Sequence, residues 1–195
     1  MSRCKFLGAS ILSVVLFHTV TAFGALPLGD PEAVLDLSGK DRDPFAAPAK
    51  ARVFLFVRSD CPITNRYAPE LARIAREFAG RETEFWLVYP DPAMTAEKIR
   101  SHMVDFGFLG QPLRDPNHEL VKRAHAVTAP EAAVFDSEGK LSYHGRIDDL
   151  WVDAGRTRPV AHSHDLEDAI MAVLDGHAPA SAETKAVGCS LSDVK

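Results

Sequence analysis

The chain has 195 residues, of which 25% are charged and 46% are hydrophobic, and its formal net charge at pH 7 is −5. This is the composition of a folded domain, and it excludes a chain that is disordered throughout. The mildly acidic balance argues against nucleic acid or an anionic membrane surface as the main partner.

The first 25 residues have the pattern of a secretory signal peptide. Arg3 and Lys5 give a positive start, residues 6–17 form an apolar core, and small residues before Pro27 offer a cleavage site. We therefore expect an exported protein, periplasmic or extracellular, with no stable membrane insertion after cleavage. A mature chain of about 170 residues fits one domain with one good core.

The chain after the predicted signal divides into three parts. Residues 26–50 are rich in Pro, Gly, Asp and Ala and are interpreted as an N-terminal arm. Residues 51–176 carry the periodic segments and form the predicted domain. Residues 177–195 form a tail without periodicity, and this tail carries Cys189.

The domain begins with strands and helices in alternation. Residues 52–58 are a continuous apolar run, which is typical of a strand buried on both faces. Over residues 63–78 apolar side chains recur at three- and four-residue spacing, which predicts an amphipathic helix with Pro62 in its first turn. Residues 84–89 and 95–106 repeat the strand and the helix, the second helix starting at a threonine cap.

The second half of the domain predicts a hairpin followed by a closing helix. The expected elements are a short strand at 112–115, a short helix at 117–125, hairpin strands at 132–136 and 141–144, a polar loop at 146–164 and a helix at 164–174. This order describes an α/β fold, a three-layer sandwich with a mixed central sheet and flanking helices.

Cys61 is the main candidate for chemistry, because it lies where the first buried strand turns into a helix. The positive end of the helix dipole and unpaired backbone N–H groups favour the thiolate there, and the thiolate is the reactive form. Arg58 and Arg66 can add a positive field, Asp60 opposes it, and the Thr64 hydroxyl can donate a hydrogen bond to the sulfur. The alternative is a buried structural cysteine without reactivity.

The segment VFLFVRSDCPITNRYAPELARIAREF, residues 53–78, resembles the active-site strand and helix of the thioredoxin superfamily. It is most similar to the exported redoxin (AhpC/TSA-like) branch, here with a Cys-Pro-Ile-Thr motif. Residues 127–130 resemble the proline loop of the family, and residues 132–141 the strands that follow it. The resemblance implies a thioredoxin-like fold with Pro130 in cis beside Cys61, shaping a groove for a partner strand.

The motif also departs from three related groups. Thr64 stands where thioredoxins have the second cysteine of Cys-x-x-Cys, and Asn65 where the copper chaperones of cytochrome oxidase assembly have theirs. Arg58 and Phe54 stand where peroxiredoxins have the threonine and the proline that position peroxide. Peroxide reduction is therefore a less favoured alternative to thiol–disulfide exchange.

Cys189 can supply the missing second thiol. The hypothesis is that Cys61 attacks a disulfide or an oxidant and that Cys189 resolves the product as an intramolecular disulfide. The expected partner is a protein thiol or disulfide, or a small oxidant. Two alternatives stay open, which are a permanent Cys61–Cys189 staple that ties down the tail and a stapled binding domain without chemistry.

His162 and His164 raise the possibility of a metal site. A His-x-His pair with one or two thiolates is a credible ligand set for Cu or Zn, so a metallochaperone-like module is the second class of function. The alternative is a solvated loop that leads into a helix. The oxidoreductase hypothesis requires no cofactor, and no motif for nucleotide binding, serine hydrolysis or zincin chemistry is present.

Overall fold

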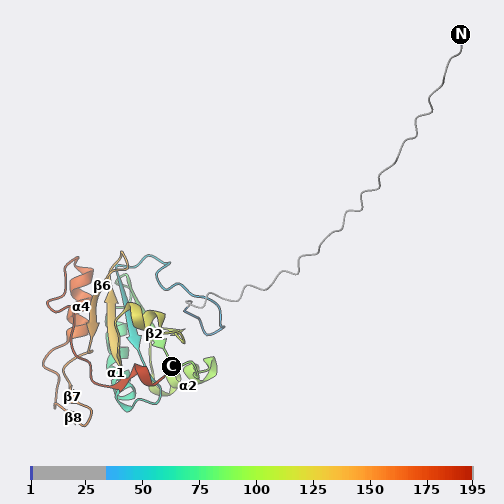
Figure 1. Ribbon diagram of the computed structural model, residues 1–195. Coiled ribbons are helices and arrows are strands. Elements are labelled where there is room, and N and C mark those ends of the chain that lie inside the picture. The colour runs from blue at the N-terminus through green and yellow to red at the C-terminus, as the bar shows by residue number, and fades with distance from the viewer. Residues whose placement is uncertain (2–33, 195) are drawn as a thin grey trace.

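The computed structural model describes Met1 and residues 34–194 (Figure 1). The predicted signal peptide beyond Met1, including Cys4, and the arm up to residue 33 lie outside the described residues. The elements are β1 (Ala51–Phe56), α1 (Pro62–Glu77), β2 (Thr83–Tyr89), α2 (Ala96–Phe106), β3 (Gln111–Arg114), α3 (Glu119–Arg123), β4 (Thr128–Ala129), β5 (Glu131–Phe135), β6 (Leu141–Gly145), β7 (Trp151–Asp153), β8 (Arg156–Thr157), α4 (Asp165–Leu174), β9 (Cys189–Ser190) and the 3₁₀ helix η1 (Leu191–Asp193).

The main sheet has five strands in the order β3-β2-β1-β5-β6. β1, β2 and β3 run parallel, whereas β5 is antiparallel to β1 and β6 is antiparallel to β5. The parallel strands are joined through α1 and α2, and the antiparallel pair forms the predicted hairpin. The sheet is therefore mixed, as the sequence predicts, and Figure 1 shows it at the centre of the molecule with α4 on one side.

The side chains of β1 alternate between two hydrophobic cores. Val53 and Leu55 belong to the core that includes residues of α1, α2 and α4, and Phe54 and Phe56 belong to the core that includes residues of α3. Because side chains alternate between the faces of a sheet, a strand covered on both faces is apolar at every position. The three-layer α/β arrangement predicted from the sequence is thus confirmed.

Two segments contain structure that the sequence analysis does not predict. Residues 146–164, expected to be a polar loop, contain the small hairpin β7–β8, in which an ion pair joins Asp153 to Arg156. The strands β7 and β8 are two or three residues long, too short for a periodic pattern to be recognised.

No helix in the described part of the chain has the length and apolar character needed to cross a membrane.

The tail also differs from the expectation. Instead of lacking structure, it contains β9 and η1, and β9 pairs antiparallel with β4 as a separate two-stranded sheet. A pairing of two residues with a remote strand leaves no local periodicity in the sequence. This pairing positions the candidate site.

Candidate functional site

Cys61 lies at the amino end of α1, as the sequence predicts. It is the residue before the first turn, with φ −90° and ψ 112°, and Pro62 begins the helix. The Cys61 side chain is fully buried, and its thiol donates a hydrogen bond to the carbonyl oxygen of Ala129 at 3.1 Å. The sulfur therefore lies between the start of a helix and the segment that leads into Pro130.

The surroundings of Cys61 favour its thiolate. Burial opposes ionisation most strongly, but the hydrogen bonds that the thiolate can accept from the Cys189 thiol, from the backbone and hydroxyl of Thr64 and from the backbone of Ile63 outweigh it. The pKa of Cys61 is consequently held below the usual thiol value. The helix terminus supplies the backbone donors that the sequence analysis expects there.

Thr64 contributes a side-chain donor that can be tested directly. Its hydroxyl is buried and has no hydrogen-bond partner among the described residues, so it is free to donate to the sulfur once Cys61 ionises. In Thr64→Val the Cys61 thiolate loses this donor, and we expect the pKa of Cys61 to rise.

The measurement is the pH dependence of Cys61 alkylation by iodoacetamide, followed by mass spectrometry. The midpoint of the profile should move to higher pH in Thr64→Val and stay in place in Thr64→Ser, which keeps the hydroxyl. Equal midpoints in the two variants would show that the hydroxyl does not stabilise the thiolate.

The tail brings the second thiol to the site. The Ala129–Pro130 peptide bond is cis, as the resemblance implies, and Ala129 in β4 lies opposite Cys189 in β9. Since the Cys61 thiol donates to the same Ala129, the two cysteines are neighbours, and their side chains are hydrogen bonded to each other. Both are free thiols in this structure.

The two thiols have opposite tendencies to ionise. Burial, the hydrogen bond to Cys61 and the charge on Cys61 raise the pKa of Cys189 to about 12, although the positive charge of Arg58 opposes this. Cys189 therefore keeps its proton around neutral pH, and Cys61 is the thiol that ionises first as the pH rises. The two thiols therefore differ in acidity, and Cys61 is the more acidic of the pair.

Arg58 connects the end of β1 to the tail. Its Nη1 donates to the carbonyl oxygen of Ser190 at 2.6 Å, and its Nε and Nη2 donate to the carboxylate of Asp60 at 3.0 and 2.8 Å. The sequence analysis expects Arg58 to act on Cys61, whereas its direct contacts hold the residue that follows Cys189. Arg66 instead places its guanidinium 5.8 Å from the centre of the Trp151 ring.

Glu131 is a supporting residue that the sequence analysis missed. It is buried, and its Oε2 accepts hydrogen bonds from the backbone N–H groups of Val127 and Thr128, both at 3.0 Å. Its Oε1 lies 3.2 Å from Nδ1 of His144. Glu131 thus fixes the segment that carries Ala129. The signal was available, because Glu131 is the single charged residue in the strand that follows Pro130.

A partly buried hydrogen-bond chain that includes Asn65 was also missed. The Oδ1 of Asn65 lies 2.8 Å from Nε2 of His102, and Nδ1 of His102 lies 2.9 Å from the hydroxyl of Tyr89. The Asn65 amide nitrogen donates to the carbonyl oxygen of Ser59 at 3.0 Å. The chain ties the turn before Cys61 to β2 and α2, which no spacing in the sequence indicates.

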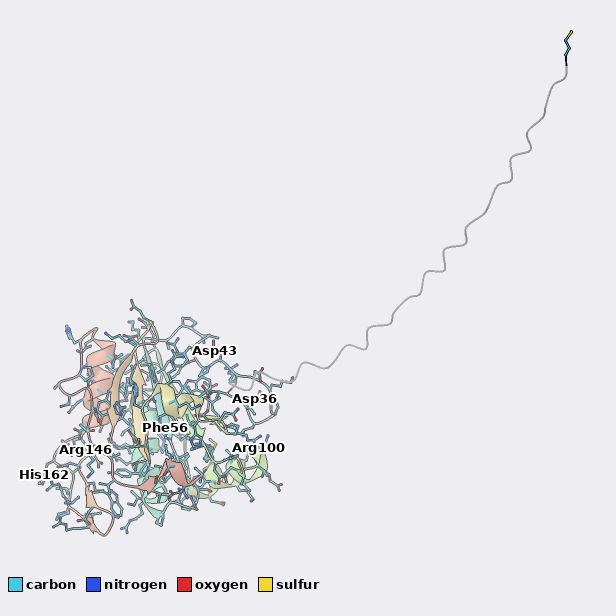
Figure 2. The ribbon with its side chains drawn as sticks, viewed as in Figure 1. Asp36, Asp43, Phe56, Arg100, Arg146 and His162 are labelled. Atoms are coloured by element: carbon cyan, nitrogen blue, oxygen red, sulfur yellow. The ribbon has the colours of Figure 1, made fainter. Side chains whose placement is uncertain are left out.

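The histidines of the predicted metal set do not join the cysteines. The backbone N–H of His162 donates to Asp149, and His164 precedes α4 with its Nδ1 3.5 Å from Glu167. Figure 2 shows His162 at the outer edge of the molecule, away from Phe56 in the sheet. Cys61, Cys189 and the two histidines therefore form no common ligand set in the structure.

One other group of potential ligands occurs among residues 34–194. Glu70, His164 and Glu167 have ligand atoms within 4.8 Å of one another. Arg73 already pairs with both glutamates, its Nη2 lying 2.6 Å from Glu70 and 2.5 Å from Glu167. The guanidinium offsets part of the negative charge of these carboxylates, so the group is explained as an ion-pair cluster between α1 and α4.

Comparison with models of protein families finds no match, and comparison with curated proteins finds none either. Solved structures do match. An uncharacterized conserved protein from Geobacillus kaustophilus has a TM-score of 0.70 at 22% identity, and the match covers 82% of this chain and 86% of that one.

Two further structures carry informative descriptions. A secreted disulfide oxidoreductase of Mycobacterium tuberculosis, homologous to E. coli DsbE, has a TM-score of 0.50 at 16% identity, covering 74% of this chain and 94% of that one. The exposed lipoprotein thioredoxin of Streptococcus pneumoniae TIGR4 has a TM-score of 0.50 at 20% identity, with 74% and 97% covered. At these identities the comparison establishes the fold, which is thioredoxin-like.

Proposed function

We propose that this chain is an exported thiol–disulfide oxidoreductase in which Cys61 is the nucleophile and Cys189 the resolving cysteine. The observation that carries the proposal is the pairing of Ala129 with Cys189, since the Cys61 thiol donates to that same Ala129. Two hydrogen-bonded thiols, one with a lowered pKa and one with a raised pKa, are suited to successive roles in exchange.

The chemistry proceeds in two displacement steps. The Cys61 thiolate attacks one sulfur of a substrate disulfide, and the other sulfur leaves as a thiolate that takes up a proton. Cys189 then loses its proton and attacks the Cys61 sulfur, and the remaining substrate sulfur leaves as a thiolate. One disulfide is thereby reduced to two thiols, while the two cysteines are oxidised to a disulfide.

The order of these steps follows from the charges. The negative charge on Cys61 contributes to the raised pKa of Cys189. In the mixed disulfide Cys61 has no charge, so that contribution is gone, whereas burial still raises the pKa of Cys189 and the positive charge of Arg58 still opposes it. We therefore expect Cys189 to ionise more readily after Cys61 has reacted than before.

The proposal of export rests on the signal-like pattern of residues 1–25. Two proteins of similar fold support it, because one is described as secreted and the other as an exposed lipoprotein. A compartment outside the cytoplasm also suits a protein thiol or disulfide as the partner, since disulfides persist there.

The test is a redox titration of the wild-type protein in glutathione buffers, with acid quenching, alkylation and mass spectrometry. We expect a Cys61–Cys189 disulfide that forms and breaks within the range of the buffer, as for a working pair. A bond that resists reduction by glutathione would indicate a permanent staple. A failure to form any bond between the two cysteines would contradict the resolving role of Cys189.

A further inference from the structure

Residues 186–193, here called the tail strand, contain β9 and end in η1, and β9 pairs with β4 beside Cys61. In Figure 1 the red C-terminal segment crosses the molecule near one end of the sheet, close to α1. Within it, β9 is the one strand that pairs with β4 among the described residues. Cys61 has no exposed surface in this structure, so a disulfide reaches its sulfur only after a neighbouring segment moves.

The tail strand is held by hydrogen bonds at the two residues that follow Cys189. Arg58 donates to the carbonyl oxygen of Ser190 at 2.6 Å, and the backbone N–H of Leu191 donates to the carbonyl oxygen of Val127 at 3.0 Å. The Leu191 side chain is 2% exposed and belongs to the same hydrophobic core as Phe56. The site thus accepts a large aliphatic side chain two residues after a cysteine.

The position before the cysteine accepts only a very small residue. A Cβ atom added at Gly188 would lie 2.1 Å from the carbonyl oxygen of Ala129 and 2.6 Å from its carbonyl carbon. No Cβ atom is tolerated at such distances unless the backbone shifts. The site that the tail strand occupies is therefore selective at two positions, one for glycine and one for a large aliphatic side chain.

We propose that the tail strand occupies the substrate groove of this protein as an internal copy of its substrate. The substrate would be an extended segment of another protein, with glycine before its disulfide-bonded cysteine and a large aliphatic residue two positions after it. This inference rests on the proposed thiol–disulfide exchange and adds the class of substrate. Arg58, Val127 and β4 would hold the substrate as they hold the tail.

Exchange of strands then accompanies the exchange of disulfides. When the tail strand leaves, the substrate segment pairs with β4, and the Cys61 thiolate attacks its cysteine sulfur while the partner sulfur departs as a thiolate and is protonated. The returning tail strand brings Cys189 to the Cys61 sulfur, and the substrate sulfur leaves as a thiolate. The electron balance is that of the two steps given above.

The test uses the full-length Cys189→Ser protein, which stops after the first step. The probe is a synthetic peptide with the sequence of residues 185–194, its cysteine joined by a disulfide to thionitrobenzoate, whose release is coloured. Two matched peptides carry valine in place of the glycine or aspartate in place of the leucine. Glutathione joined by a disulfide to thionitrobenzoate serves as a small substrate whose sequence does not match the tail strand.

We expect the tail-matched peptide to react with Cys61 at least about tenfold faster than either altered peptide, from the lost burial of the aliphatic chain or the clash at glycine. We also expect the tail-matched peptide to react faster with the double variant Cys189→Ser/Leu191→Asp than with Cys189→Ser. In the double variant the protein's own tail strand binds less tightly and so competes less with the peptide. Equal rates for the three peptides, or an unchanged rate in the double variant, would overturn the inference. Failure of the glutathione probe as well would overturn the proposed function itself.

Discussion

The Cys61→Ser variant is expected to lose thiol–disulfide exchange, with its rate on oxidised glutathione falling to the uncatalysed background, a loss of more than about 1000-fold. A serine hydroxyl does not ionise near neutral pH, so the hydrogen bonds that stabilise the Cys61 thiolate have no anion to act on. The measurement is the initial rate of glutathione release under pseudo-first-order conditions.

Cys189→Ser is the matched control for that loss. It removes the other thiol and keeps Cys61, so we expect a single fast turnover that ends in a stable mixed disulfide on Cys61. The adduct is detected by mass spectrometry and removed by a dithiol. If Cys61→Ser formed the adduct and Cys189→Ser did not, the two cysteines would have the opposite roles.

Much of the fold was predictable because its signals are local. The run at 52–58 is apolar at every position since Val53 and Phe54 face different cores, and such a run indicates a doubly covered strand. Pro62 marked the start of α1, and Thr95 caps α2 by accepting the N–H of Lys98 at 3.3 Å. Each of these features depends on residues within one turn or one strand.

The position of Cys61 was predictable for the same reason, but its partners were not. A cysteine between a buried strand and a proline-started helix must lie at the helix terminus. That Ala129 and Cys189 come to the same sulfur depends on a sheet of two residues per strand, formed between segments about 60 residues apart. The resemblance supplied the cis Pro130, which the residues alone do not indicate.

The histidine pair shows what proximity in sequence leaves undetermined. His162 and His164 are two residues apart, but Asp149 accepts the backbone N–H groups of His162 and Ser163 at 2.6 and 3.1 Å. The loop is therefore organised by its backbone around a carboxylate. Convergence of metal ligands requires side chains directed to one point, which spacing alone does not determine.

Gly188→Ala is expected to separate the two thiols without changing either of them. The added Cβ would lie 2.1 Å from the carbonyl oxygen of Ala129, so β9 cannot pair with β4 in its present position. Cys189 would then reach Cys61 only from a loose tail, whose effective concentration is in the mM range. We expect formation of the Cys61–Cys189 disulfide to slow by on the order of 100-fold relative to the docked pair.

The same change should make Cys61 more accessible, so its alkylation by a bulky maleimide should become faster while disulfide formation becomes slower. Opposite changes in the two rates are the signature of a displaced tail when the circular dichroism spectrum of the variant matches that of the wild type, because a loss of thiolate character would slow both reactions. Gly155→Ala is the matched control, since a Cβ there meets nothing nearer than the Asp153 carboxylate at 3.8 Å. Unchanged rates of both reactions in Gly188→Ala would mean that the tail reaches Cys61 by a route that does not require its pairing with Ala129.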